Sequence, residues 1–249
     1  MTRPAVVLLH AFPLNSRMWD DQIDALQDRW RVIAPDLTGF GDAGAPDDPA
    51  TYSVEAYADE VAATLADRGV ERAVIGGLSM GGYVAFSFLR RHRGTVAGLV
   101  LADTRAAADT PEVAERRVAQ QHQVAENGTA ELIESSLDNL LSDDTKQHRP
   151  EVVEAARKLM AQNPPAGMIG ALDAMRRRPD AIDELAAIDV PVLILVGAAD
   201  KTSPPDVAAD MAARIPDARL EVLPGAGHLS NLEASDAFNA ALISFLDEL

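Results

Sequence analysis

Ser79 is the residue of this sequence best placed to act as a nucleophile. It lies in Gly77-Leu78-Ser79-Met80-Gly81, a G-x-S-x-G pattern between an apolar β-type run and a helical one. Side chains two positions either side of the serine would collide across so tight a turn, and Gly77 and Gly81 have none. The following helix directs its N-terminal dipole and the Met80 N–H toward an oxyanion. A glycine-rich packing loop or a phosphate cradle is the alternative, although the Lys-Ser/Thr pair of a Walker motif is absent.

His228 is the histidine best placed to serve as a general base. It ends the run Gly225-Ala226-Gly227-His228, directly after the last apolar strand-like run, so it lies on a loop at the carboxyl edge of the strands. Open α/β sheets bind their ligands at that edge. Ser230 and Glu233 beyond it predict a capping box for the final helix. A solvated loop histidine is the alternative, and His10, at the end of the first strand, is expected to brace a loop.

A serine–histidine pair also needs an acid that orients the imidazole and stabilises its protonated form. Asp200 follows the strand that ends in Val196-Gly197, which gives the chain order Ser, Asp, His. Asp103, at the end of the strand after the nucleophile helix, is the alternative acid. A turn-forming or helix-capping role is the structural alternative for both aspartates.

The elements that must position these residues alternate between apolar runs and helical periodicities. Ser53 is expected to cap one of the helices and Gly69 to end it. Repeated βαβ units predict an α/β fold, with a mostly parallel sheet and helices on both faces. Runs typical of buried strands occupy residues 5–9, 31–37, 73–76, 96–102, 190–196 and 219–223.

A long helical segment interrupts this alternation. From residue 105 to about residue 185 the sequence is rich in Ala, Glu, Gln and Arg and contains no strand-like run. We therefore predict an α/β core of residues 1–104 and 187–249, with residues 105–186 inserted as a helical cap over one edge of the sheet.

The composition excludes several function classes. The 249 residues carry 22 Lys and Arg against 39 Asp and Glu, a net charge of −17, which repels nucleic acid and anionic lipid surfaces. The absence of cysteine excludes disulfides and iron–sulfur clusters, and no HExxH spacing indicates zinc, so neither metal nor cofactor is expected. No apolar stretch approaches the roughly 20 residues of a membrane span, and a cytoplasmic location is the default expectation.

The motifs LLHAFP, APDLTGFG, GLSMGG, VGAAD and GAGH together resemble the α/β-hydrolase fold superfamily over nearly the whole chain. The resemblance implies a Ser79, Asp200, His228 triad and an oxyanion hole made by the backbone N–H groups of Phe12 and Met80. One departure is Ala11, where relatives usually have glycine. The other is the early first strand: the hairpin that precedes it in most relatives is missing, so about six strands are expected instead of eight.

The substrate class follows from the nucleophile and the cap. Serine in place of aspartate disfavours haloalkane and epoxide chemistry, and residues 91–237 contain no Phe, Tyr or Trp. Any pocket ceiling is therefore expected to be aliphatic and rich in methionine, and the alternative role for these side chains, which is favoured for most of them, is ordinary cap core. The candidate pocket residues are Met160, Met168, Ile169, Leu172 and Met175.

We expect a carboxylesterase-like serine hydrolase that cleaves a small carboxylic ester or lactone through an acyl-enzyme. The GLSMGG turn and residues 158–175 are also similar to 3-oxoadipate enol-lactonases, which gives one alternative. Arg176, Arg177 and Arg178 would offer that lactone a cation, or form a solvated helix end. The remaining alternatives are a non-hydrolytic lyase or perhydrolase on the same triad, and a catalytically silent ligand-binding relative.

Overall fold

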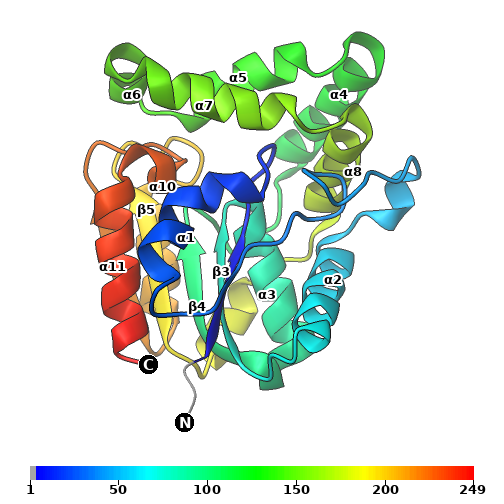
Figure 1. Cartoon of the computed structure of the whole chain (residues 1–249). Coiled ribbons are helices and arrows are strands. Elements are labelled where there is room, and N and C mark those ends of the chain that lie inside the picture. The colour runs from blue at the N-terminus through cyan, green and yellow to red at the C-terminus, as the bar shows by residue number, and fades with distance from the viewer. Residues whose placement is uncertain (1–3) are drawn as a thin grey trace.

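Six parallel strands form one sheet in the order β2-β1-β3-β4-β5-β6 (Figure 1). The computed structural model describes residues 4–249. The expected α/β-hydrolase fold with about six strands is confirmed. The strands are β1 (Ala5–Leu9), β2 (Val32–Ile33), β3 (Ala73–Leu78), β4 (Val96–Ala102), β5 (Val192–Gly197) and β6 (Ala218–Leu223).

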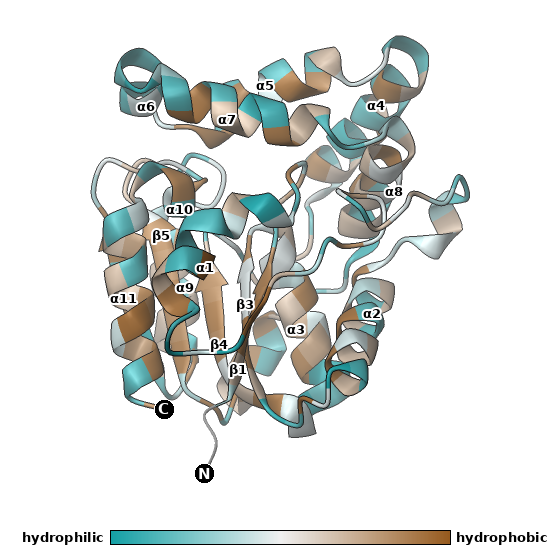
Figure 2. Ribbon diagram, viewed as in Figure 1, coloured by the Kyte–Doolittle hydropathy of each residue, from teal (hydrophilic) through white to brown (hydrophobic). Residues whose placement is uncertain are grey.

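The central strands are apolar because both of their faces are covered. Every residue of β1, β3 and β5 is buried, and these strands carry the most hydrophobic stretches of the ribbon (Figure 2). The edge strand β6 instead includes Arg219 and Glu221, which pair with one another at 2.9 Å. Continuous burial in the centre and charge at the edge are the pattern of a parallel sheet between helical layers.

The second strand is much shorter than the sequence indicates. The apolar run 31–37 predicts a full strand, but β2 contains only Val32 and Ile33, paired with Val6 and Val7. Pro35 has no backbone N–H to give to a ladder, and the chain turns there into the loop that begins at Asp36.

Helices cover both faces of the sheet (Figure 1). Helix α1 (Asp20–Leu26) contacts α11 (Ser235–Asp247) on one face, and α2 (Val54–Asp67) contacts α3 (Met80–His92) on the other. The expected ends of α2 are confirmed, since Ser53 Oγ accepts a hydrogen bond from the Ala56 N–H at 3.0 Å and Gly69 follows with φ of 64°. The other core helices are α9 (Pro205–Arg214) and α10 (Ser230–Glu233). Short 3-10 helices span Ser16–Trp19, Pro49–Thr51, Arg93–Thr95 and Ile182–Ala187.

Five consecutive helices between β4 and β5 lie over the carboxyl edge of the sheet (Figure 1). We call them the cap. The predicted domain boundaries, after residue 104 and before residue 187, fall in the segments that lead into and out of this layer. The cap helices are α4 (Pro111–Asn127), α5 (Ala130–Leu140), α6 (Asp143–His148), α7 (Pro150–Ala161) and α8 (Pro165–Arg177).

The cap is tied to the core at the loops after β1 and β2. The Asn163 side chain donates a hydrogen bond to the Pro13 carbonyl at 2.7 Å and accepts one from the Gly41 N–H at 2.9 Å. Close by, a Cβ added at Gly167 would lie 1.8 Å from the Gly39 carbonyl oxygen. Helix α8 can approach the loop after β2 so closely only because the contact is between the backbones of Gly167 and Gly39.

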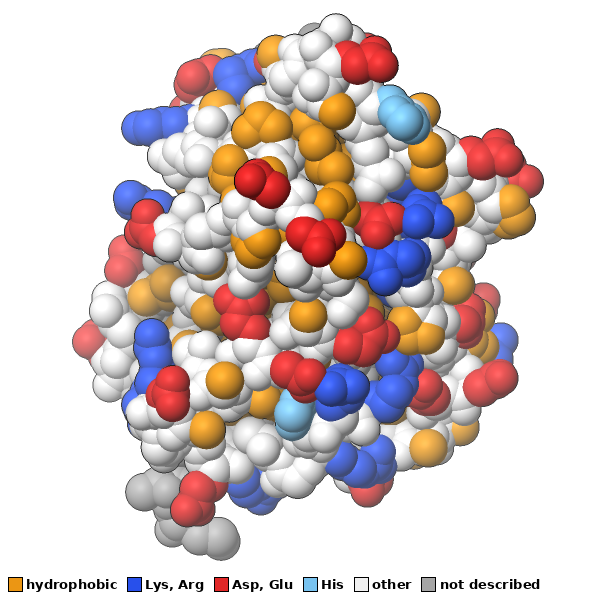
Figure 3. Space-filling model, turned by 90° about the vertical axis from the view of Figure 1, so that its right-hand side faces the viewer, with side chains coloured by type: hydrophobic (Ala, Val, Ile, Leu, Met, Phe, Trp, Pro, Cys, Tyr) orange, Lys and Arg blue, Asp and Glu red, His pale blue; other side chains and the backbone are white. Residues whose placement is uncertain are grey.

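Acidic and basic side chains alternate over the face that carries α2 and α8 (Figure 3). Two exposed clusters of this kind are Arg91 with Asp59, and Arg177 with Asp173. Such solvated pairs contribute little to stability. Within residues 4–249, no helix is both long and apolar enough to cross a membrane.

Candidate active site

Ser79 lies at the tip of a sharp turn between β3 and α3. Its φ of 54° is rare for a residue with a side chain, and the turn is held by two hydrogen bonds. The Ser79 N–H donates to the Ala102 carbonyl at 2.9 Å, and the Thr104 hydroxyl donates to the Ser79 carbonyl at 2.8 Å. A Cβ at Gly77 would lie 2.1 Å from the Gly81 carbonyl, so only glycine fits there. The turn therefore holds the Ser79 hydroxyl clear of the sheet.

His228 joins Ser79 to Asp200 through two short hydrogen bonds. Its Nε2 lies 2.8 Å from Ser79 Oγ, and its Nδ1 lies 2.8 Å from Asp200 Oδ2. The side chains of His228 and Asp200 are 1% and 0% exposed, so water does not compete for this contact. A proton on Nδ1 donated to the carboxylate leaves Nε2 free to accept the Ser79 hydroxyl proton.

Asp200 is held in its ionised form. Burial alone would raise the pKa of this carboxyl, but the His228 charge and hydrogen bond and two backbone amides outweigh it, and its pKa lies below the ordinary value. The amides belong to Thr202 and Ser203, which donate to Oδ1 at 2.7 and 2.9 Å. One carboxylate oxygen is thus occupied by its own loop while the other faces the imidazole.

Asp103, the alternative acid, forms its hydrogen bonds with groups other than His228. Its Oδ1 accepts a hydrogen bond from the Gly197 N–H at 2.8 Å, and its other oxygen accepts one from the Ser230 hydroxyl. Burial first, and then the charge of Asp200, raise the pKa of Asp103 well above its ordinary value. Asp103 therefore bridges β5 and α10, and the carboxylate in contact with His228 is that of Asp200.

The two expected oxyanion donors come from two segments near Ser79. Phe12 forms part of the cavity wall beside Ser79, and Met80 is the first residue of α3. Within residues 4–249, neither backbone N–H donates to a protein acceptor. The N–H of Ala11 is already used, since it donates to Met18 Sδ at 3.2 Å. The Phe12 and Met80 amides thus remain available to a ligand oxygen.

His10 braces the loop that carries Phe12, as expected from its position. Its Nε2 accepts a hydrogen bond from the Leu37 N–H at 3.1 Å, and its Nδ1 lies 3.1 Å from the Ala11 carbonyl. Burial lowers the pKa of His10 to about 4. A neutral His10 is therefore part of the support of the oxyanion loop.

A cavity of about 400 Å³ opens onto Ser79 and His228 between core and cap. The expectation of an aliphatic ceiling is wrong: of the five candidate pocket residues, only Met175 lines this cavity. Met160, Met168 and Leu172 are fully buried inside the cap, because they lie on the faces of α7 and α8 that pack against other helices, and Ile169 packs partly buried against the same core. The walls are Phe12, Tyr83, Val113, Leu140 and Met175 on the apolar side and Arg105, Asp109, Arg116, Arg117, Gln120, Ser135, Ser136, Asn139, Lys201 and Thr202 on the polar side.

The arginine run of α8 does not reach this cavity. Arg176 and Arg177 both pair with Asp173 on their own helix, at 2.6 and 2.7 Å. Arg178 is buried, pairs with Asp109 at 2.6 Å and stacks its guanidinium 3.9 Å above the Tyr83 ring. These three side chains are thus paired away from the cavity, and the cations of the cavity come from other positions.

A family model described as alpha/beta hydrolase fold matches residues 4–235 of the chain. The chain belongs to the alpha/beta hydrolase fold family. A thermophilic esterase from Thermogutta terrifontis, solved with malate bound, superposes with a TM-score of 0.94 at 39% identity, covering 99% of this chain and 90% of that one.

Two curated relatives of this hydrolase span nearly its whole length. A pimeloyl-[acyl-carrier protein] methyl ester esterase of Neisseria meningitidis is 32% identical, over 97% of this chain and 93% of the relative. The 3-oxoadipate enol-lactonase 2 of Acinetobacter baylyi is 28% identical, over 96% of this chain and 87% of the relative. The resemblance to esterases and enol-lactonases is thereby confirmed.

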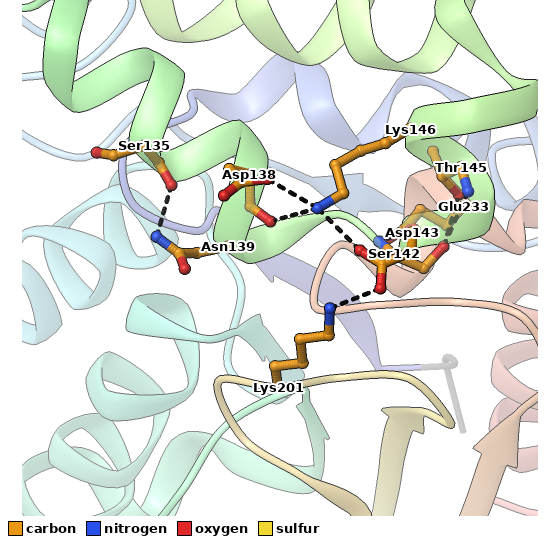
Figure 4. Close-up of polar contacts among 9 residues, drawn as sticks. All are labelled: Ser135, Asp138, Asn139, Ser142, Asp143, Thr145, Lys146, Lys201 and Glu233. Atoms are coloured by element: carbon orange, nitrogen blue, oxygen red, sulfur yellow. Dashed lines mark hydrogen bonds and ion pairs between the residues drawn. The ribbon is translucent and has the colours of Figure 1, made fainter.

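In this hydrolase the end of α5, the start of α6 and the turn between them make polar contacts with two loops, the one that carries Asp200 and the one that carries His228 (Figure 4). Lys201, next to Asp200, donates to Asp143 of α6 at 2.8 Å. On the other side the His228 N–H donates to the Leu140 carbonyl at 2.8 Å. We call this group of contacts the cap clasp, and it makes the placement of acid and base depend on the cap.

Glu233 is the centre of the cap clasp, and the capping box predicted for it is wrong. Its carboxylate accepts hydrogen bonds from the N–H groups of Ser142 at 2.8 Å, Gly227 at 3.0 Å and Leu229 at 3.3 Å. Ser230 does not cap the helix, because its hydroxyl is bonded to Asp103. Glu233 thus holds the residues on both sides of His228.

Sequence reasoning also missed the cavity-facing stripe of α4. Val113, Arg116, Arg117 and Gln120 line the cavity and stand at positions i, i+3, i+4 and i+7 of one helix face. That spacing was visible in the sequence, but an exposed charged helix face has the same pattern. Only the position of α4 above Ser79 distinguishes the two.

Proposed function

We propose that this hydrolase is a serine esterase that cleaves a small carboxylic ester or lactone through an acyl-enzyme on Ser79. The observation that carries the proposal is the hydrogen-bonded chain from Ser79 through His228 to Asp200, with 2.8 Å at each step. A nucleophile bonded to a base that is itself oriented by an acid is the arrangement of acyl-transfer catalysis. The esterases and lactonase among the relatives agree with this reaction class.

In the first half of the reaction Ser79 Oγ attacks the carbonyl carbon of the substrate while His228 Nε2 takes the hydroxyl proton. The negative charge that develops on the carbonyl oxygen is stabilised by the N–H groups of Phe12 and Met80. Asp200 stabilises the imidazolium, which then gives its proton to the leaving alkoxide. The C–O bond to the alcohol breaks, and the acyl group stays on Ser79.

In the second half water takes the place of the alcohol. His228 removes a proton from the water, the hydroxide adds to the acyl carbon and the bond to Ser79 breaks. The proton returns to Ser79 Oγ, which restores the starting state and releases the acid. With a lactone, acid and alcohol belong to one molecule, so a single hydroxy acid is released.

A fluorophosphonate probe with intact-mass detection tests the nucleophile, together with p-nitrophenyl esters from acetate to octanoate. We expect one adduct per chain, its loss in the Ser79→Ala variant, and faster turnover of the short esters. Labelling of Ser79→Ala, or ester turnover by that variant at the wild-type rate, would disprove the assignment of Ser79.

A lactonase is the second candidate because the cavity carries several basic side chains and the relatives include enol-lactonases. The measurement that separates the candidates is the ratio of kcat/KM for an enol-lactone to that for an open ester of equal size. A lyase or perhydrolase on the same chain of residues would label with the probe but leave both substrates unhydrolysed.

A further inference from the structure

We infer that the cavity binds an anionic acyl substrate, the half-ester or lactone of a dicarboxylic acid, and that Arg105 receives its free carboxylate. The inference rests on the proposed function, since it names the substrate class of the same site. Its basis is a set of cations in the wall of the Ser79 cavity that the protein's own carboxylates do not neutralise.

The cavity has a charge opposite to that of the whole protein. Its wall carries four basic side chains, Arg105, Arg116, Arg117 and Lys201, and one acidic side chain, Asp109. The chain as a whole has a net charge of −17. A local excess of positive charge inside an acidic protein selects for ligands that carry negative charge where they contact the wall.

Two of these cations are already satisfied. Arg117 pairs with Asp109, and Lys201 pairs with Asp143 at 2.8 Å. Asp109 also receives the buried Arg178 at 2.6 Å, so each of its two oxygens already has an arginine partner. These pairs act as fixed parts of the wall.

Arg105 and Arg116 have no such partner. Within residues 4–249, neither side chain lies within ion-pair distance of an acidic group. Arg105 is half-buried, and its Nε is buried without a hydrogen-bond acceptor, unlike any other side chain in the wall of this cavity. A buried, unpaired N–H of a charged group costs stability, and with no carboxylate of the protein in contact the charge of this cavity-lining guanidinium is left for a ligand carboxylate to pair.

The position of Arg105 links it to the nucleophile. It follows Thr104, whose hydroxyl holds the Ser79 carbonyl at 2.8 Å, so its backbone is fixed relative to Ser79. Arg116 is exposed on the cavity-facing stripe of α4, at the mouth of the same space. A guanidinium binds a carboxylate through two parallel N–H···O bonds, which fixes the orientation as well as the charge. We therefore assign Arg105 as the residue that binds the substrate carboxylate, and Arg116 as the residue that attracts this carboxylate at the mouth of the cavity.

The test compares monomethyl glutarate with dimethyl glutarate, which differ by one charge at the same length, using acid release in a pH-stat. Wild type should prefer the half-ester by about tenfold or more in kcat/KM, the effect of one charged hydrogen-bonded contact. Arg105→Gln should remove most of that preference by raising KM for the half-ester, and Arg116→Gln should reduce it less. Arg157→Gln, at a partly exposed cap arginine that pairs with Glu134 and Glu154 and does not line the cavity, is the matched control and should keep it.

Binding to the Ser79→Ala variant separates this inference from the proposed function. By calorimetry monomethyl glutarate should bind, dimethyl glutarate should bind about tenfold more weakly or not at all, and Arg105→Gln in that background should abolish the difference. Equal binding of the two esters would overturn the inference whatever the turnover. So would inorganic phosphate that competes for the site as strongly as monomethyl glutarate does. Hydrolysis of both esters by the wild type without preference would overturn the inference and leave the esterase proposal intact. Selective binding of the half-ester by the wild type without hydrolysis would overturn the esterase proposal and leave the inference intact.

Discussion

Glu233 accepts a hydrogen bond at 2.8 Å from the backbone N–H of Ser142, and this contact joins the loop of the candidate base to the cap. The same carboxylate holds the N–H groups of Gly227 and Leu229, the residues on either side of His228. A carboxylate can accept all three bonds because its two oxygens together offer about four lone-pair sites. The direction of the His228 ring therefore depends on a residue that does not touch it.

The Glu233→Gln variant should separate an effect on the position of His228 from an effect on substrate binding. The amide nitrogen cannot accept, so at least one of three buried N–H groups loses its partner, which costs about 1–3 kcal/mol of stability. We expect kcat for short esters to fall by roughly tenfold, the effect of about 1.4 kcal/mol, while KM changes little. The fluorophosphonate labelling rate should fall in parallel with kcat.

Glu131→Gln is the matched control, since it makes the same change on an exposed position of α5. It should leave kcat and the melting temperature at their wild-type values. If Glu233→Gln lowered the melting temperature while the turnover of the folded protein stayed constant, Glu233 would be structural only.

The assignment of the acid can be tested by two isosteric changes. Asp200→Asn should lower kcat/KM by roughly 10⁴-fold, because the amide cannot stabilise the imidazolium and favours the wrong tautomer. Asp103→Asn should cost far less, because its partners are the Gly197 N–H and the Ser230 hydroxyl. Loss of activity in Asp103→Asn with retention in Asp200→Asn would reverse the assignment.

The same Asp103 variant has a distinct stability signature. The raised pKa of Asp103 means that the folded chain holds this proton more tightly than the unfolded chain. Stability from the neutral carboxyl is therefore complete near pH 4 and below, and is lost as the pH rises through the folded pKa. Melting curves of Asp103→Asn and wild type should nearly coincide near pH 4 and diverge toward higher pH, with the variant more stable.

The sequence is sufficient to predict the parallel sheet, the turn at Ser79 and the order of the candidate triad. Each of these depends on local features: apolar runs bounded by breakers, glycines around a serine, and polar residues directly after strands. The cavity wall is different. Arg105 and Arg116 look like solvated charges in the sequence, and only the placement of α4 over the sheet brings both to one space.

The failures of prediction have the same origin. Ser230 and Glu233 stand at the spacing of a capping box, yet each has a partner from a distant segment, Asp103 and Ser142, that competes with the local arrangement. Met160 and Met168 have flexible side chains of the kind that line adaptable pockets, but both are fully buried by the packing of helices inside the cap. Local patterns give the candidate bonds, and tertiary contacts select among them.

The strained backbone at Ser79 predicts a gain in stability when its side chain is removed entirely. A non-glycine residue at positive φ costs about 1–3 kcal/mol, part of which glycine returns through its larger unfolded-state entropy. Ser79→Gly should therefore be more stable than Ser79→Ala by about 1 kcal/mol in urea unfolding, both variants being inactive. At Ser136, inside α5, the order of the same pair should be reversed. Equal stability of the two Ser79 variants would show that the turn is unstrained.

His10 should make the fold sensitive to mild acid. Its pKa is about 4 in the folded chain against 6.5 for a free imidazole, a difference worth roughly 3 kcal/mol. Because the folded value is the lower one, this stability is complete above about pH 6.5 and is lost as the pH falls through about 4. His10→Gln should be less stable at pH 7, where its amide replaces the bond from Leu37 only in part, and its melting temperature should fall less than that of wild type between pH 6.5 and 4. His122→Gln, an exposed change on α4, should follow the wild-type curve, and a His10→Gln curve parallel to wild type would show that protonation of His10 does not limit the fold.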